Sequence, residues 1–216
     1  MFAKDGTSVI ITVLVISVLL AVVGLLIPYI WVSYLFYLAA FLLTAFTLFF
    51  FRDPDRVIPN GDDFLIAPAD GKVILIQKVK KHKYLQADGT QISIFLSPLD
   101  VHVNRIPASG IIEHEQYFPG EYLVAWHEKS SDLNERSEFV VRHDKGTKIY
   151  FKQIAGFVAR RIVYHIGVGD HVKAGERFGM MRFGSRMDII VPNNVSLKVK
   201  KGQRTIGGET ILGIIE

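Results

Sequence analysis

The sequence predicts a mainly β protein, with a compact barrel or sandwich domain over residues 52–216 that follows a membrane hairpin of two helices over residues 1–51. Two observations support this prediction. No charged residue lies between Asp5 and Arg52, in a chain that is 50% hydrophobic with a mean hydropathy of +0.28. After residue 52 apolar and polar residues alternate at a period of two, and no long stretch shows helical periodicity.

The charge-free stretch holds two apolar runs, 9–27 and 31–51, with Pro28 between them. Each run is long enough, at about 1.5 Å per residue, to cross roughly 30 Å of hydrocarbon. Positive residues flank only the open ends, with Lys4 on one side and Arg52 on the other. The positive-inside rule therefore predicts a cell-membrane protein in which both open ends, and everything after residue 52, lie on the cytoplasmic face. The alternative, a cleaved signal peptide, is disfavoured because the apolar region is too long.

Seven segments of the second part have the alternation of β-strands and are bounded by Gly, Asp and Asn turn signals. They are 72–79, 91–95, 139–141, 148–154, 161–166, 187–191 and 195–199. A Val-Lys-x-Gly pattern at 172–175 recurs at 199–202, and it resembles the turn of biotinyl and lipoyl carrier domains. We expect two similar hairpins, one on each side of the 184–185 dipeptide.

Composition narrows the classes of partner and cofactor. The net charge of +4 and a pI near 9.2 favour an anionic membrane surface, and no basic stripe or aromatic stacking motif suggests nucleic acid. The chain has no cysteine, which excludes disulfides, thiolate metal sites and cysteine nucleophiles. None of the seven histidines forms a His-x-His or His-Glu-x-x-His motif, so no metal site is predicted.

Three positions are candidates for chemistry. Gly184 and Ser185 form the single Gly-Ser dipeptide, where a flexible glycine lets the serine hydroxyl approach the peptide bond before it; a tight turn is the simpler interpretation. Asp70 lies in a Pro-Ala-Asp-Gly turn, where an aspartate ordinarily caps its own backbone. His102 follows a strand-like segment and could carry a proton, although a lone histidine is usually structural. By composition alone, 134–138 is a solvated turn.

Taken together, six ordered blocks resemble the phosphatidylserine decarboxylases in their short bacterial and archaeal form. The blocks are FFRDPDR, PADGKV, ISIFLSPLDVHVNRIPASG, NERSEF, IAGFVARRIV and FGSRMD. The resemblance implies a proenzyme that cleaves itself between Gly184 and Ser185 into a β chain, 1–184, and an α chain, 185–216. It also implies a covalent pyruvoyl cofactor made from Ser185.

The implied chemistry begins with attack of Ser185 Oγ on the Gly184 carbonyl, followed by β-elimination and loss of ammonia. The resulting ketone forms a Schiff base with the amine of phosphatidylserine and acts as the electron sink while carbon dioxide leaves, giving phosphatidylethanolamine. By resemblance, Asp70 helps to activate Ser185, and His102 handles the proton that replaces the carboxylate. Arg105 stands where the longer branch of the family has a second histidine, and His127 is a possible substitute base.

Two other classes stay open from the residues. A membrane-anchored hydrolase or peptidase could use Ser185, although the chain lacks Gly-x-Ser-x-Gly. A non-enzymatic carrier or adaptor would explain the paired Val-Lys-x-Gly turns, but it needs an exposed lysine at a hairpin tip. The sequence leaves open whether the lipid is phosphatidylserine or an ether-linked archaeal analogue, which residues grip the head group, and whether the two chains assemble into a higher oligomer.

Overall fold

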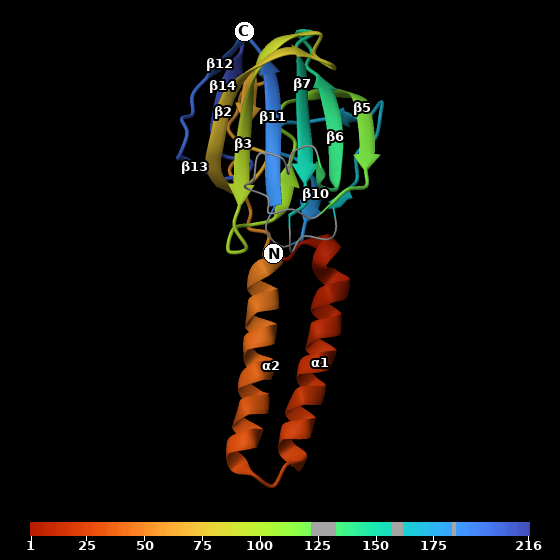
Figure 1. Ribbon diagram of the computed structural model, residues 1–216, viewed down its shortest axis with the longest axis vertical. Helices are drawn as coiled ribbons and strands as arrows, with labels where there is room; N and C mark the ends of the chain where they lie inside the picture. Colours follow the sequence, from red (N-terminus) through yellow and green to blue (C-terminus); the bar gives the residue numbers. More distant parts are fainter. Residues whose placement is uncertain (122–132, 157–161, 183–184) are drawn as a thin grey trace. The chain divides into compact units, whose positions relative to one another are not determined.

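The structure, a computed structural model, describes residues 1–121, 133–156, 162–182 and 185–216. The chain falls into two compact units, Met1–Asp55 and Arg56–Glu216. The first is helical and the second is built from strands (Figure 1). Each unit is described in turn.

The helical unit is the predicted hairpin. A short 3-10 helix, Lys4–Gly6, leads into α1, Thr7–Leu26, and α2 covers Ile30–Phe50. Pro28 lies in the turn between them, where its missing N–H and fixed φ do not interrupt a helix. Both helices are long and apolar enough to cross a membrane.

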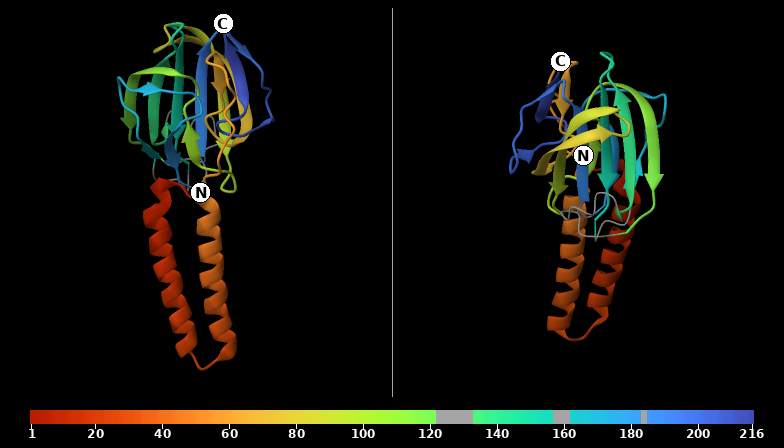
Figure 2. Two further views of the ribbon diagram at one scale, coloured as in Figure 1. Left: turned by 180° about the vertical axis from the view of Figure 1, so that it is seen from behind. Right: turned by 45° about the horizontal axis from the view of Figure 1, so that its top comes forward.

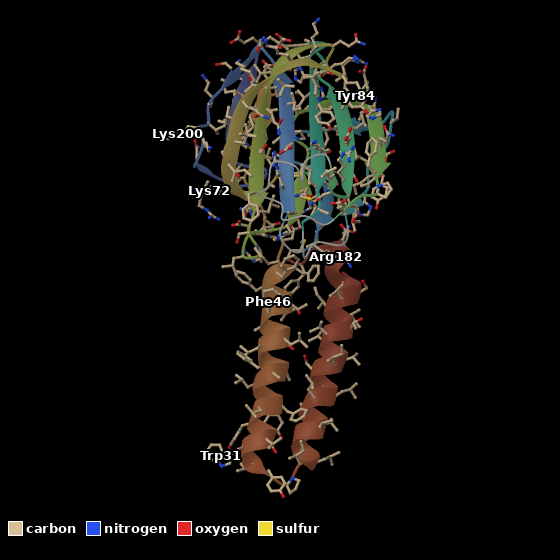
Figure 3. All side chains as sticks on the ribbon, in the orientation of Figure 1. Trp31, Phe46, Lys72, Tyr84, Arg182 and Lys200 are labelled. Atoms are coloured by element: carbon tan, nitrogen blue, oxygen red, sulfur yellow. The ribbon has the colours of Figure 1, made fainter. Side chains whose placement is uncertain are left out.

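Small and hydroxyl side chains line the contact between the two helices. Thr44 Oγ1 donates a hydrogen bond of 2.9 Å to Ser17 Oγ. A Cβ placed on Gly24 would lie 2.9 Å from the Tyr37 ring, so a larger residue there would push the ring away and loosen this close approach. The outward side chains are large and apolar: Leu26 is 79% exposed and Trp31, at the turn end of the hairpin in Figure 3, is 80% exposed. Such a surface suits hydrocarbon rather than water.

The β unit is organised around one antiparallel sheet of eight strands, in the order β13-β2-β3-β11-β7-β6-β5-β9 (Figure 1). Its strands are β2 Gly71–His82, β3 Ala87–Leu96, β5 Gly110–Phe118, β6 Arg136–Arg142, β7 Lys148–Ile154, β9 His171–Val172, β11 Ser185–Pro192 and β13 Arg204–Thr205. The sheet curls into a half-barrel, and the turn end of its β2–β3 hairpin bends over the neighbouring strands (Figure 2, right). The prediction of a mainly β barrel or sandwich is confirmed.

Two three-stranded sheets complete the unit. One has the order β1-β14-β12 and the other β4-β10-β8. Their strands are β1 Phe64–Ile66, β14 Ile211–Ile215, β12 Val195–Leu197, β4 Val103–Arg105, β10 Arg177–Met181 and β8 Ile162–Tyr164. One hydrophobic core draws on all three sheets, through residues such as Ile94, Phe178 and Leu212.

All seven predicted strands are present, and the segment 148–154 has the predicted bounds. The sequence prediction omitted others, including the nine-residue β5 and the C-terminal β14. The interpretation of 134–138 as a solvated turn is wrong. Residues from Arg136 onward belong to β6, and Asn134 and Ser137 are fully buried. These polar residues are buried because they lie in β6, which pairs with a strand on each side, or just before it.

The two Val-Lys-x-Gly segments adopt the same turn. Gly175 and Gly202 have φ of +82° and +90°, values that favour glycine. In each turn the backbone N–H of the lysine donates to a side chain three residues on, from Lys173 to Glu176 and from Lys200 to Gln203. Each turn joins strands of two different sheets, so the similarity lies in the bend and not in a paired hairpin.

Candidate active site

Ser185 is the first residue of β11, the strand between β3 and β7 in the large sheet. Side chains alternate along this strand: Met187 and Ile189 belong to the core, which puts Ser185 on the core side as well. The serine is fully buried, and its Oγ has no hydrogen-bond partner among the described residues. An unbonded buried hydroxyl costs about 1–3 kcal/mol, so its persistence requires a reason.

Arg186, the next residue, points to the other face of the sheet and is held there. Its Nε donates to Asp188 Oδ1 at 2.6 Å, and its Nη2 donates to Ser93 Oγ at 2.8 Å. Arg186 is 2% exposed and Asp188 is fully buried, so each charge depends on the other. Ser185 also pairs with Leu96 of β3, and its neighbour Arg186 pairs with Ile154 of β7, so the start of β11 is held between two strands.

The predicted site residues meet at one end of the large sheet, the lower end in Figure 1. β2 and β11 begin at this end and β3 finishes there, because Phe95 pairs with both Lys72 and Arg186. Asp70 precedes β2, and the loop after β3 leads to His102. Arg182, the last described residue before Ser185, lies at the same end of the β unit (Figure 3).

His102 is fully buried beside the segment that leads into the dipeptide. Its backbone carbonyl accepts a hydrogen bond of 3.2 Å from the N–H of Met181, four residues before Ser185. The ring Nδ1 lies 2.9 Å from the Asp100 carbonyl oxygen. A carbonyl only accepts, so Nδ1 carries the proton and Nε2 is the nitrogen that can take one up.

Asp70 lies on the far side of β3 from Ser185, two strand spacings or about 10 Å away in the sheet. Its carboxylate forms two hydrogen bonds with Arg56, at 2.8 and 3.0 Å, and accepts one of 2.7 Å from the N–H of Gly207. No hydrogen bond joins Asp70 to Ser185 Oγ in this arrangement. Asp70 thus lies at the same end of the sheet as Ser185, without direct contact with it.

Arg105, at the position of a second histidine in the longer branch, is almost fully buried. Its Nη1 donates to the Gly175 carbonyl at 2.9 Å, and its backbone N–H donates to Pro68 O. These contacts tie β4 to two turns and give the side chain a structural role. Gly184 and His127 lie outside the described residues, so the cleavage-site glycine and the alternative base stay predictions.

A group of buried polar residues at the same end was not predicted. Asn104, Gln153, Ser137 and Glu135 are each less than 5% exposed. Gln153 Nε2 donates to Asn104 Oδ1 at 2.8 Å, while Gln153 Oε1, Asn104 Nδ2 and Glu135 Oε2 have no partner among the described residues. A sequence signal existed. Gln153 interrupts the apolar face that Ile149 and Phe151 begin on β7.

The opposite face of the large sheet carries a polar cavity of about 350 Å³, lined in part by Arg186, Lys152 and Tyr150. Burial raises the pKa of the Tyr150 hydroxyl, and the nearby Glu138 charge adds to the shift. Burial also lowers the pKa of His82, and Lys152 adds to that shift. Neither Asp70 nor His102 lines this cavity, so the candidate active site is on the core side.

The fold and the site define a class: a mainly β protein with an apolar helical hairpin and a buried, unbonded serine at the start of its central strand. The sequence model of the phosphatidylserine decarboxylase family matches residues 43–213. The phosphatidylserine decarboxylase proenzyme of Salinibacter ruber is 56% identical over 170 residues, which cover 78% of this chain and 75% of the relative. The proenzymes of Chlorobium phaeobacteroides strain BS1 and Amoebophilus asiaticus are 49% and 46% identical, each over 78% of this chain and over 78% and 75% of the relative.

The chain belongs to the phosphatidylserine decarboxylase family. It is therefore an enzyme, a decarboxylase of phospholipid metabolism made as a proenzyme.

Proposed function

We propose that the chain cleaves itself and becomes a pyruvoyl-dependent enzyme that converts phosphatidylserine into phosphatidylethanolamine. The proposal depends chiefly on the Ser185 hydroxyl, which is fully buried at the start of the central strand and has no hydrogen-bond partner among the described residues. A hydroxyl in that state is suited to attack the carbonyl carbon of the preceding residue.

Cleavage between Gly184 and Ser185 yields the β chain, 1–184, and the α chain, 185–216. Ser185 Oγ bonds to the Gly184 carbonyl carbon as the carbon–nitrogen bond breaks, and the resulting ester loses the Gly184 carboxylate by β-elimination. Water then replaces the nitrogen of residue 185, which leaves as ammonia, and a ketone remains. The two chains stay together because β11 is hydrogen-bonded to β3 and β7 along its length.

The surroundings of position 185 fit a covalent pyruvoyl group. The position is buried on the core side, and Arg186 anchors the strand from the other face, so a new chain end there is held in place. Such a group supplies an electrophilic carbonyl that takes up the substrate amine and withdraws electrons as carbon dioxide leaves. His102, with Nδ1 bound to Asp100 O, is proposed to deliver from Nε2 the proton that replaces the carboxylate.

The direct test is conversion of phosphatidylserine in detergent micelles by the purified full-length chain. We expect two chains on a denaturing gel, formation of phosphatidylethanolamine, and loss of activity after borohydride reduction. Activity that survives borohydride, or an active chain that stays whole, would contradict the pyruvoyl mechanism and favour an ordinary serine hydrolase.

Changing Asp70 to asparagine is expected to slow self-cleavage about 100-fold, the lower end of the range for general acid–base groups. The carboxylate is already engaged in an ion pair with Arg56, which argues against a larger effect. The measurement is the fraction of uncut chain over time on a denaturing gel. Asp63→Asn, at an exposed ion pair with Lys145, is the matched control. Cleavage of Asp70→Asn at the wild-type rate would remove Asp70 from maturation.

We also propose that α1 and α2 span the cell membrane and that residues 56–216 lie on its cytoplasmic face. The support is the length and apolar surface of the two helices, together with positive residues only at their open ends. The substrate lipid would then be supplied from the same membrane that anchors the enzyme.

Reporter fusions test this topology. A reporter joined after Arg56 should register as cytoplasmic, because Lys4 and Arg52 hold both open ends inside. A reporter inserted at Tyr29, in the turn, should register on the other side and serves as the control. An extracytoplasmic signal after Arg56 would replace the hairpin with a single signal-anchor helix.

A further inference from the structure

The amide pair formed by Asn104 and Gln153 crosses the core between two sheets. Asn104 is on β4, in a three-stranded sheet, and Gln153 is on β7, next to β11 in the large sheet. Their single mutual hydrogen bond is 2.8 Å long, and both side chains are fully buried. The pair therefore occupies a fixed place inside the β unit.

This pair lies beside position 185. Gln153 is the cross-strand partner of Met187, two residues along β11 from Ser185. Phe151 and Met187 both belong to the core, so alternation puts Gln153 and Ser185 on the same face. Diagonal neighbours of this kind have backbones about 7–8 Å apart, within reach of a long side chain.

The pair leaves one hydrogen-bond donor and one acceptor open. Asn104 Nδ2 and Gln153 Oε1 have no partner among the described residues. Rotating both amide groups by 180° reverses the mutual bond but again leaves one NH2 group and one carbonyl oxygen without a partner. Buried polar atoms are almost always paired, so two open atoms beside a reactive position indicate a ligand.

We infer that Asn104 and Gln153 bind the amino-acid end of the serine head group, with the open N–H donating to its carboxylate. This inference rests on the proposed function. The substrate amine reacts at position 185, and its carboxylate is attached to the adjacent carbon, so the carboxylate must lie within a few bond lengths of residue 185. The open C=O accepts from the substrate amine on its approach. A phosphodiester carries only acceptors and could not use both atoms.

A neutral donor suits this reaction better than a cation. The carboxylate loses its charge as carbon dioxide forms, so an arginine or lysine would stabilise the substrate more than the transition state. An amide N–H orients the carboxylate with a weaker interaction. The product has no carboxylate and leaves the N–H unpaired again, so its affinity is lower and it can depart.

The test is Asn104→Asp in the full-length enzyme. Aspartate keeps the shape and the acceptor for Gln153 Nε2, but it removes the open donor and places a negative charge against the carboxylate. We expect wild-type self-cleavage, and kcat/KM for phosphatidylserine lower by about 10- to 100-fold, the range for a lost hydrogen bond to a charged group. A second variant, Gln153→Glu, changes the other member of the pair. Its control is Gln77→Glu, because Gln77 is an amide in the same sheet that lines the cavity on the other face.

A binding measurement gives a readout apart from turnover. Mature protein inactivated with borohydride is titrated calorimetrically with dihexanoyl phosphatidylserine and with dihexanoyl phosphatidylethanolamine. Wild type should prefer the serine lipid by about 10-fold or more, and Asn104→Asp should lose that preference. If Asn104→Asp fails to fold, judged by thermal unfolding, Gln153→Glu decides by the same measurements.

The outcomes separate the two claims. A processed Asn104→Asp variant with unchanged kcat/KM and unchanged lipid preference overturns this inference alone. A folded variant that stays uncut also overturns it, because the pair would then serve chain cleavage. A wild-type chain that does not act on phosphatidylserine overturns the proposed function instead.

Discussion

Changing Ser185 to alanine will leave the chain whole and without decarboxylase activity. The change removes the hydroxyl that must form the ester, and it should cost little stability because that hydroxyl forms no hydrogen bond among the described residues. On a denaturing gel the variant should run as one chain of the full 24.3 kDa. A folded, uncut chain with a near-normal unfolding temperature would show that the loss is chemical.

Changing Ser185 to cysteine separates self-cleavage from formation of the ketone. A thiol can still attack the Gly184 carbonyl, but elimination from the thioester is expected to be slower, and hydrolysis would leave an amino-terminal cysteine. We expect partial or slow cleavage with little activity. Full activity of Ser185→Cys with a free amino terminus at 185 would contradict the need for a ketone.

The wild-type α chain provides a direct chemical check. It should begin at residue 185, resist Edman sequencing because it has no free amine, and have the mass of a chain whose terminal serine has become pyruvoyl. Ser93→Ala is a suitable control for Ser185→Ala, since it removes a buried serine hydroxyl that accepts a hydrogen bond from Arg186 on the other face of the same sheet. That variant should still cleave. An ordinary serine amine at the start of the α chain in active enzyme would contradict the mechanism.

The helical hairpin and the central strands were predictable because their signals are local. A charge-free run of helix length is typical of a helix with apolar surroundings on all sides. A strict period of two is typical of a strand with a core on one face. Strand β5 was harder, since Glu113, His114 and Glu115 break the alternation and the strand lies near the sheet edge. Strand β14 contains Gly213, whose packing against Ser196 becomes evident only once the strands are paired.

The reactive residue of the candidate site could be predicted from the sequence, but most of the residues around it could not. Gly184-Ser185 and the six blocks indicate the chemistry directly, whereas the roles of Asp70 and His102 depend on resemblance. The amide pair could not be found from spacing, because Asn104 and Gln153 are far apart in sequence and meet only across two sheets. The segment 134–138 misled because a charged composition is typical of a loop, while here its strand has a buried polar face.

Changing His102 to alanine is expected to reduce decarboxylation by about 10²- to 10⁴-fold while leaving self-cleavage nearly intact. The physical reason is the direction of its hydrogen bond. Nδ1–H donates to Asp100 O, which fixes the ring and makes Nε2 the nitrogen that exchanges a proton. The required proton goes to the carbon that has lost carbon dioxide, a step that follows chain cleavage.

The matched control is His143→Ala, which also removes a buried histidine bonded to a backbone carbonyl, that of Asp62 at 2.9 Å. Arg136 begins β6 near the site, where it pairs with Ile154, and His143 follows the other end of this strand. Loss of the His143 ring should therefore affect stability more than turnover. The measurements are the two-chain ratio on a gel and kcat at saturating phosphatidylserine. If His102→Ala is processed and its turnover is near normal, His102 is not part of the site. If the variant folds but stays uncut, His102 acts in maturation instead, with Nε2 as the base for Ser185.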